Sequence, residues 1–164
     1  MSKKHLIEIQ IEEQLVEEKK AQIPTQPIRE AALSTLAYAN IAEPCEAAIV
    51  ISDDATLHDL NRRFRGVDRP TDVIAFTNDP RGPFGMGAPG MPRYLGDIVI
   101  SVERAAVQAE EAGGSLTEEL QLLTVHGMLH LLGYDHATLA EKTQMWTAQA
   151  AVLEQLGIDI PLPE

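Results

Sequence analysis

The feature that most constrains this chain is a nearly continuous apolar run from Leu120 to Leu132. Ser115 and Glu118, just before the run, have the spacing of a capping box, so a helix is predicted to begin after Ser115. A helix that is apolar on nearly every face belongs in a core. Gly133 can adopt the left-handed conformation that often ends a helix. The chain is therefore expected to fold around one central buried helix.

Three of the five histidines lie at the end of this predicted helix. His126 and His130 are four residues apart, which places their Cβ atoms roughly 5–6 Å apart on one helix face. The bend at Gly133 is expected to return His136 toward them. Three imidazoles with a fourth position open to water form a ligand set of catalytic zinc, and imidazole also suits copper, iron and nickel. We predict one divalent ion per chain, with Zn²⁺ as the first candidate.

The spacing of these histidines, with a glycine in the bend, is the ligand pattern of metzincin proteases. Those enzymes carry a glutamate, the general base of peptide hydrolysis, directly after the first histidine. Here that position is Gly127. The ligands are present and the usual base is absent, so a zinc metallopeptidase-like hydrolase is kept only as an alternative.

The string HGMLHLLGYDH at 126–136 resembles the signature H-G-x-L-H-L-x-G-Y-D-H of the YbeY family of bacterial rRNA maturation endoribonucleases, and every fixed position matches. The segments LNRRFRGVDRPTDVIAF at 60–76 and LGDIVIS at 95–101 occur in the same order in that family. The resemblance covers about the last two thirds of the chain firmly and the first third loosely. It implies metal-dependent cleavage of single-stranded RNA, in maturation of the 16S rRNA 3′ end and in ribosome quality control.

The resemblance also implies partners and site residues. The partners are RNA of the small ribosomal subunit and, with it, ribosomal proteins or GTPase assembly factors. Arg65 matches the arginine that is implicated in cleavage in that family, and its planar fork of donors suits phosphate. We expect Arg65 and His126 to be catalytic. An alternative stays open for Arg65, because an arginine in the last turn of a helix favours the helix dipole without any substrate.

The charge of the chain is unusual for a protein that acts on RNA. The net charge is −12, whereas nucleic-acid-binding proteins usually carry a basic surface. Positive charge is concentrated in residues 61–104, from which we expect Arg62, Arg63 and Arg69 to bind substrate. The acidic remainder favours another alternative, a non-catalytic ribosome-binding factor stabilised by a metal. Structural zinc sites normally have four protein ligands, however, and only three are evident.

Two acidic residues are candidates to support the metal ligands. Asp97 is a candidate acceptor for a histidine N–H, and a structural role at a strand edge is the alternative. Asp135, beside His136, is a candidate to orient an imidazole or carry a proton, and a helix cap is its alternative. The segment 78–94 holds four Pro and four Gly in seventeen positions. Such a long loop is expected to be functional or disordered.

The rest of the chain is predicted to be α+β, with a small mixed four-stranded sheet packed with about five helices. The predicted strands are 4–11, 47–51, 73–76 and 94–100, and the predicted helices are 26–40, 53–65, 101–112, 115–132 and 138–157. In the second helix Leu57, Leu60 and Phe64 are expected to share an apolar face, and in the last one Met145 and Trp146 are expected to be core residues. With the resemblance, the fold is expected to be zincin-like.

Composition is compatible with one domain over 1–164. The chain is 45% hydrophobic and 23% charged, which is ordinary for a globular protein. No run of 18 apolar residues or cleavable leader is evident, so we expect a cytoplasmic protein that does not cross a membrane. The single cysteine, Cys45, excludes an internal disulfide.

Overall fold

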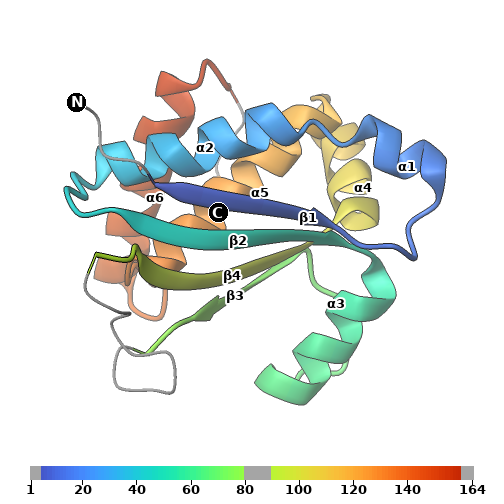
Figure 1. Ribbon diagram of the computed structural model, residues 1–164. Coiled ribbons are helices and arrows are strands. Elements are labelled where there is room, and N and C mark those ends of the chain that lie inside the picture. The colour runs from blue at the N-terminus through green and yellow to red at the C-terminus, as the bar shows by residue number, and fades with distance from the viewer. Residues whose placement is uncertain (1–4, 80–89, 160–164) are drawn as a thin grey trace.

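The computed structural model describes residues 5–79 and 90–159. Within these residues the chain forms one sheet of four strands, β1 (Leu6–Ile11), β2 (Cys45–Ser52), β3 (Val73–Thr77) and β4 (Arg93–Ser101). The strand order is β1-β2-β4-β3, in which β1, β2 and β4 are parallel and β3 is antiparallel to β4 (Figure 1). The predicted mixed four-stranded sheet is confirmed.

Helices cover both faces of this sheet (Figure 1). The helical segments are α1 (Glu17–Gln22), α2 (Thr25–Tyr38), α3 (Asp54–Leu60), the π-helical turn η1 (Asn61–Arg65), α4 (Val102–Ala112), α5 (Leu116–Leu131) and α6 (Leu139–Gln155). In Figure 1, α2 and α5 lie on one face and α3 lies on the other. The short α1 was not predicted from the sequence. It contains no buried residue, so it has no apolar period to detect.

Helix α5 is the central buried helix, as predicted. It begins at the predicted capping box, in which Ser115 and Glu118 each bond the other's backbone. It packs against α2, α4 and α6 and against strands β3 and β4. Ten of its sixteen residues are buried, which explains why its sequence is apolar on nearly every face. The metal-ligand candidates are therefore carried by the most enclosed element of the fold.

Strand β4 divides the core into two layers. Because side chains alternate along a strand, Ile98 and Ile100 point to the face that α5 covers, whereas Val99 points to the other face. Val99 packs there with Leu57 of α3 and Ile74 of β3. The larger core cluster lies on the α5 face and includes Ile98, Ile100, Leu120 and Met128. This alternation determines which residues of β4 can approach the histidines.

The helix predicted over 53–65 differs in its second half. Asp53, the first residue of the predicted range, caps the helix, since its side chain accepts a hydrogen bond from the backbone N–H of Thr56. The α-helix ends at Leu60, and a π-helical turn continues to Arg65 before Gly66 ends it. Phe64, predicted to be on the apolar face, is instead 60% exposed. The wider π turn moves residue 64 off the face on which Leu57 is buried.

None of the helices that the structure describes is long and apolar enough to span a membrane.

Candidate metal centre

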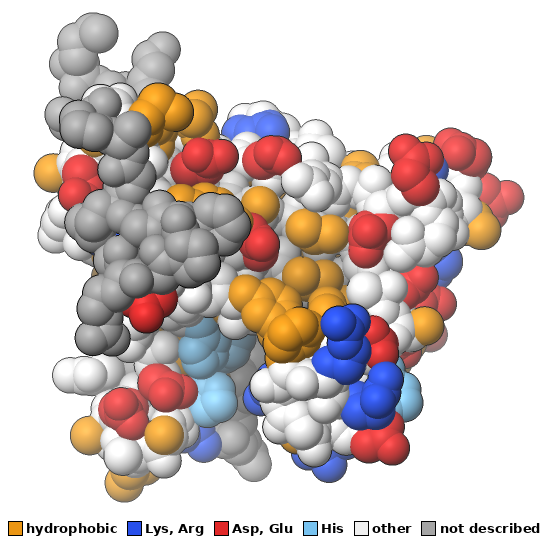
Figure 2. Space-filling model, turned by 60° about the horizontal axis from the view of Figure 1, so that its bottom comes forward, with side chains coloured by type: hydrophobic (Ala, Val, Ile, Leu, Met, Phe, Trp, Pro, Cys, Tyr) orange, Lys and Arg blue, Asp and Glu red, His pale blue; other side chains and the backbone are white. Residues whose placement is uncertain are grey.

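The three predicted histidines meet at one point. One ring nitrogen from each of His126, His130 and His136 lies within 4.8 Å of the others. The ring centroids of His126 and His130 are 4.8 Å apart, and those of His130 and His136 are 5.2 Å apart. Figure 2 shows a group of pale blue histidine side chains in a hollow of the surface. The predicted triad is thus assembled in the fold.

The turn after α5 brings the third histidine to the other two. Gly133 has a φ of +101°, a left-handed conformation that few other residues adopt. Its N–H donates to the carbonyl of His130, and the N–H of Tyr134 donates to the carbonyl of Leu129. These two bonds form a Schellman motif, which ends the helix and reverses the chain. Three residues later His136 faces His130.

Helix α6 supplies two supporting side chains that sequence reasoning missed. The amide oxygen of Gln149, a residue only 1% exposed, lies 3.0 Å from Nδ1 of His126. When Nδ1 carries its proton and donates to Gln149, Nε2 of His126 is left free to bind a metal. Trp146, predicted as core, is half-buried, with its ring 5.8 Å from that of His126 and 5.9 Å from that of His136. Met145 is fully buried, as expected.

The surroundings keep the imidazoles of His126 and His130 neutral. Burial, followed by the neighbouring rings of His126 and His136, lowers the pKa of His130 to about 4. Burial is also the main cause that lowers the pKa of His126. Neutral imidazole is the form that ligates a metal ion, so these two side chains do not have to lose protons first.

The donor set fits a divalent transition metal. Tetrahedral Zn–N bonds of 2.0–2.1 Å place ligand nitrogens about 3.4 Å apart, so small rotations of the rings would bring them to bonding distance. The exposed His136 has the most freedom to make this adjustment. The protease base has no room here, since a Cβ on Gly127 would lie 2.8 Å from Cγ2 of Ile98. Gly127 is thus a close-packing position between α5 and β4.

The histidines line one side of a groove of about 790 Å³. We call this side the histidine wall, formed by His126, Gly127, His130 and residues 133–136. The remaining lining residues are Phe64, Arg65 and residues 71–77, which we call the arginine wall. The groove therefore places the predicted catalytic Arg65 and the metal-ligand candidates in one cavity. Figure 2 shows a hydrophobic patch and basic side chains beside the hollow that holds the histidines.

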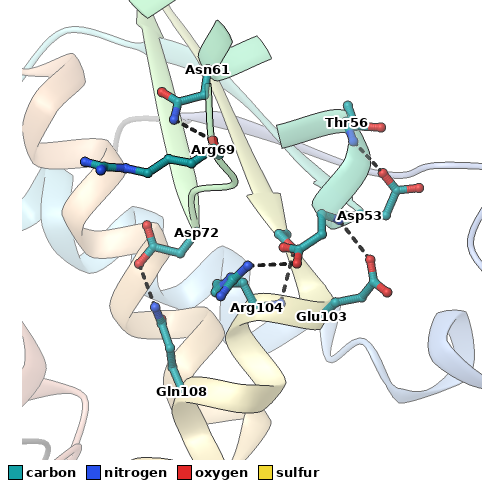
Figure 3. Close-up of polar contacts among 10 residues, drawn as sticks. Asp53, Thr56, Asn61, Arg69, Asp72, Glu103, Arg104 and Gln108 are labelled. Carbon is teal, nitrogen blue, oxygen red and sulfur yellow. Dashed lines mark hydrogen bonds and ion pairs between the residues drawn. The ribbon is translucent and has the colours of Figure 1, made fainter. Parts of the chain in front are cut away.

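Hydrogen bonds hold the two ends of the connection between η1 and β3. The side-chain amide of Asn61, only 3% exposed, donates to the carbonyl of Arg69, at 2.9 Å (Figure 3). Farther along, Gln108 of α4 donates to the carboxylate of Asp72, at 3.3 Å (Figure 3). Nε2 of His58 lies 2.7 Å from a carboxylate oxygen of Asp68. Polar contacts of Asp68 and Asp72 therefore hold this turn.

The other predicted arginines lie outside the groove lining. Arg62 and Arg63 form ion pairs with Asp59, at 2.8 Å and 3.2 Å, and both are exposed. Arg69 is also exposed. Their expected contact with substrate stays a prediction.

Asp97 does not support a histidine. It precedes Ile98, which contacts Gly127 of α5, so the alternation of β4 turns Asp97 to the opposite face of the sheet. There its carboxylate accepts a hydrogen bond from the hydroxyl of Tyr94, and burial raises its pKa. The histidine partner expected at Asp97 is Gln149 instead.

Asp135 contacts the backbone of the histidine wall. Its carboxylate accepts a hydrogen bond from the N–H of His136, at 2.7 Å. It therefore orders the turn that carries this ligand. A proton-carrier role stays a prediction, as does the role of the loop at 78–94, of which 80–89 lie outside the described residues.

A buried carboxyl group on α5 is affected by a charge on the arginine wall. Glu119, two turns before His126 on α5, is only 5% exposed. Burial, and then the nearby charge of Asp72, raise its pKa to about 7. Asp72 lines the groove, so a charge on the arginine wall acts on the helix of the histidine wall.

These features define a class: an α+β protein with three histidines in an open groove that could hold a metal ion. A model of the Endoribonuclease YbeY family matches residues 8–157. The chain belongs to this family. It is 49% identical over 132 residues to the Endoribonuclease YbeY of Chloroflexus aggregans, covering 80% of this chain and 86% of the relative. The Endoribonuclease YbeY of Chloroflexus aurantiacus is 44% identical over 155 residues, covering 94% of this chain and 97% of the relative.

The fold is also similar to a solved structure. The solution structure of TM1509 from Thermotoga maritima superimposes with a TM-score of 0.57 at 22% sequence identity. The match covers 92% of this chain and 89% of that chain. At this identity the likeness supports the fold alone.

Proposed function

We propose that this protein is a metal-dependent endoribonuclease that cleaves single-stranded RNA during rRNA processing. The observation that carries the proposal is the groove, which three converging imidazoles line together with Arg65 in a chain of the Endoribonuclease YbeY family. Maturation of the 16S rRNA 3′ end and ribosome quality control are the proposed processes. The cytoplasm is the proposed location, and the small ribosomal subunit is the proposed partner.

The chemistry divides between the two walls. His126, His130 and His136 would hold Zn²⁺, with Gln149 fixing the tautomer of His126. When bound, Zn²⁺ supplies a Lewis acid for a phosphoryl oxygen and lowers the pKa of a bound water to about 7. Arg65 binds the phosphate across the groove and stabilises the negative charge that builds on its oxygens. No glutamate base is then needed at Gly127.

The exposed arginines extend the proposed RNA contact beyond the reacting phosphate. Arg62, Arg63 and Arg69 lie on or just after the turn that carries Arg65. Flexible cationic side chains at an exposed position suit the backbone of a polyanion, which offers a phosphate at every nucleotide. The whole chain has a net charge of −12, and the segments outside 61–104 are acidic. These segments would repel a polyanion, so RNA contact is favoured at the segment that carries the arginines.

One experiment separates this function from its two alternatives. The metal-loaded protein is incubated with a short structured RNA and with casein, each with and without chelator. We expect RNA cleavage that chelator abolishes and no hydrolysis of casein. Hydrolysis of casein alone would indicate a peptidase, and metal-loaded protein that binds RNA without cleaving it would indicate a binding factor. Metal analysis of the purified protein, followed by reconstitution with zinc, cobalt, nickel or manganese, tests the proposed preference for zinc.

A further inference from the structure

Phe64 exposes a large apolar side chain to water, which is unfavourable in free energy. It is 60% exposed although the pattern with Leu57 and Leu60 predicts a buried residue. The π-helical turn η1 produces this exposure, and such turns are frequent at functional sites. The ring does not lie on a remote surface but lines the same groove as Arg65 and the three histidines.

The contacts of Phe64 give it a fixed orientation. Its ring packs edge-to-face against Phe76 of β3, with centroids 5.3 Å apart and planes at 80°. The guanidinium carbon of Arg63 lies 5.3 Å from the centre of the Phe64 ring. Phe76 also lines the groove and packs against the cluster around Leu57, so it anchors Phe64 to the core. An aromatic ring that contacts an anchoring ring and a cation, but is open to solvent, is pre-organised to stack on a planar ligand.

We propose that Phe64, backed by Phe76, is a stacking subsite for an unpaired nucleobase that flanks the phosphate held at Arg65. The proposal rests on the proposed function. Phe64 and Arg65 are consecutive residues that line one cavity, which suits a base and the phosphate attached to its nucleotide. Stacking on an aromatic side chain tolerates any base, whereas a base inside a duplex has no free face to offer. This subsite would therefore favour single-stranded over paired RNA.

The test uses substitutions that separate stacking from simple apolar contact. Phe64→Leu keeps an apolar side chain against Phe76 but removes the planar ring, and Phe64→Tyr keeps the ring. Val107→Ala, which trims a 51% exposed apolar residue of α4 outside the groove, is the matched control. Single-turnover cleavage of a short hairpin RNA with a single-stranded tail is measured with metal-loaded protein over a range of enzyme concentrations. A 2-aminopurine in the tail reports stacking, because its fluorescence is expected to be quenched when the base stacks on Phe64. The quenching is measured in the first milliseconds, before the RNA is cleaved.

Phe64→Leu is expected to raise the half-saturating enzyme concentration about 5- to 100-fold and to abolish the 2-aminopurine quenching. Its maximum rate should change far less, and its melting temperature should stay close to that of the wild type. Phe64→Tyr and Val107→Ala should behave like the wild type. An RNA with an abasic nucleotide at the stacked position should bind the wild type as weakly as intact RNA binds Phe64→Leu, and the two losses should not add.

Three results would overturn the subsite. Phe64→Leu could bind and quench like the wild type, or the abasic penalty could be equal in both proteins. Alternatively, Phe64→Leu could weaken binding to intact small ribosomal subunits but not to the hairpin RNA, which would make Phe64 a protein contact. In each case wild-type cleavage of the hairpin preserves the proposed function. A wild-type protein that neither binds nor cleaves RNA would remove the function itself, and the subsite with it.

Discussion

The histidine wall and the arginine wall of the groove are built in different ways. The histidine wall is the end of α5, a helix buried on most of its sides, and its ligands come from eleven consecutive residues. The arginine wall begins with the exposed turn η1, and two polar contacts, Asn61 with Arg69 and Gln108 with Asp72, hold the connection that follows. A metal ion requires ligands fixed to a few tenths of an ångström, whereas an RNA chain can adapt to exposed side chains. The comparison therefore predicts different consequences for substitutions on the two walls.

The largest effect is expected on the histidine wall. His130→Ala combined with His136→Ala should reduce metal content from about one ion per chain to near zero and abolish cleavage, because one imidazole cannot hold the ion. The loss of metal should also lower the melting temperature of the protein purified with metal. Metal analysis and thermal unfolding with and without chelator measure both effects. His58→Ala, at a histidine paired with Asp68, is the control and should retain the metal. Full occupancy in the double variant would contradict the triad.

The arginine wall should respond in rate and not in stability. Arg65→Lys keeps the positive charge but loses the planar fork, and should lower the single-turnover cleavage rate on the order of 10²–10³-fold, by analogy with losing one oxyanion donor. Metal content, RNA affinity and melting temperature should barely change. Arg29→Lys on α2 is the control. If Arg65→Lys and Arg65→Ala both cleave at the wild-type rate, Arg65 has no part in cleavage and only interacts with the helix dipole.

The support of the histidine wall by α6 predicts an intermediate effect. Gln149→Leu removes the acceptor for Nδ1 of His126 and should weaken metal affinity about 10- to 100-fold, as is usual when an outer partner of a ligand is lost. Titration with a competing chelator measures this change without any RNA. Gln144→Leu on the exposed side of the same helix should leave the affinity unchanged. Equal affinities in the two variants would mean that Gln149 does not orient the ligand.

The sequence was most informative where the site is local. The capping box at Ser115, the bend at Gly133 and the spacing of the three histidines are all readable from one stretch, because a helix fixes which neighbours share a face. Gln149 is 23 residues from His126, and no pattern within α6 marks it as a partner. Only the packing of α6 on α5 brings the two together.

The misplaced residues have similarly specific causes. Met145 and Trp146 are adjacent, and adjacent helical positions differ in direction by about 100°, so one enters the core while the other reaches the histidines. Phe64 was misplaced because a π-helical turn breaks the 3.6-residue period and has no simple signature. Asp97 could have been assigned correctly, since the alternation through Ile98 and Ile100 places it on the face away from α5.

The burial of Glu119 near the charge of Asp72 predicts a pH effect on stability. Glu119 has a pKa of about 7 in the folded protein and an ordinary value near 4.5, so the folded state holds a proton that the unfolded state has lost between these two values. Its contribution to stability is therefore fully present below pH 4.5 and is lost as the pH rises through 7. Glu119→Gln, which cannot ionise, should stabilise the protein by about 1–3 kcal/mol at pH 8.

The pH profile also identifies the source of that effect. At pH 4.5 the stability of Glu119→Gln should be close to that of the wild type, and Glu110→Gln at an exposed position of α4 should show no such pH dependence. Urea unfolding at a series of pH values measures the difference. The charge of Asp72 is one cause of the raised pKa of Glu119. In an Asp72→Asn background, Glu119→Gln should therefore stabilise the protein less at pH 8 than it does in the wild type. A gain that is equal at both pH values would mean that Glu119 is not the titrating group.

The smallest effect is expected at the exposed arginines. For single strands each phosphate contact contributes about 0.7 to the slope of log affinity against log salt, so Arg62→Gln with Arg63→Gln should reduce that slope by at most about 1.4. The reduction should be smaller than this limit, because both side chains already pair with Asp59. The combination of Lys19→Gln and Arg29→Gln removes the same charge away from the groove and should leave the slope unchanged.

Asp59→Asn sharpens the test, since freeing both guanidinium groups should tighten RNA binding and steepen the slope. Filter-binding titrations at several salt concentrations compare the four proteins, and a slope that none of the substitutions alters would make Arg62 and Arg63 solvated surface only.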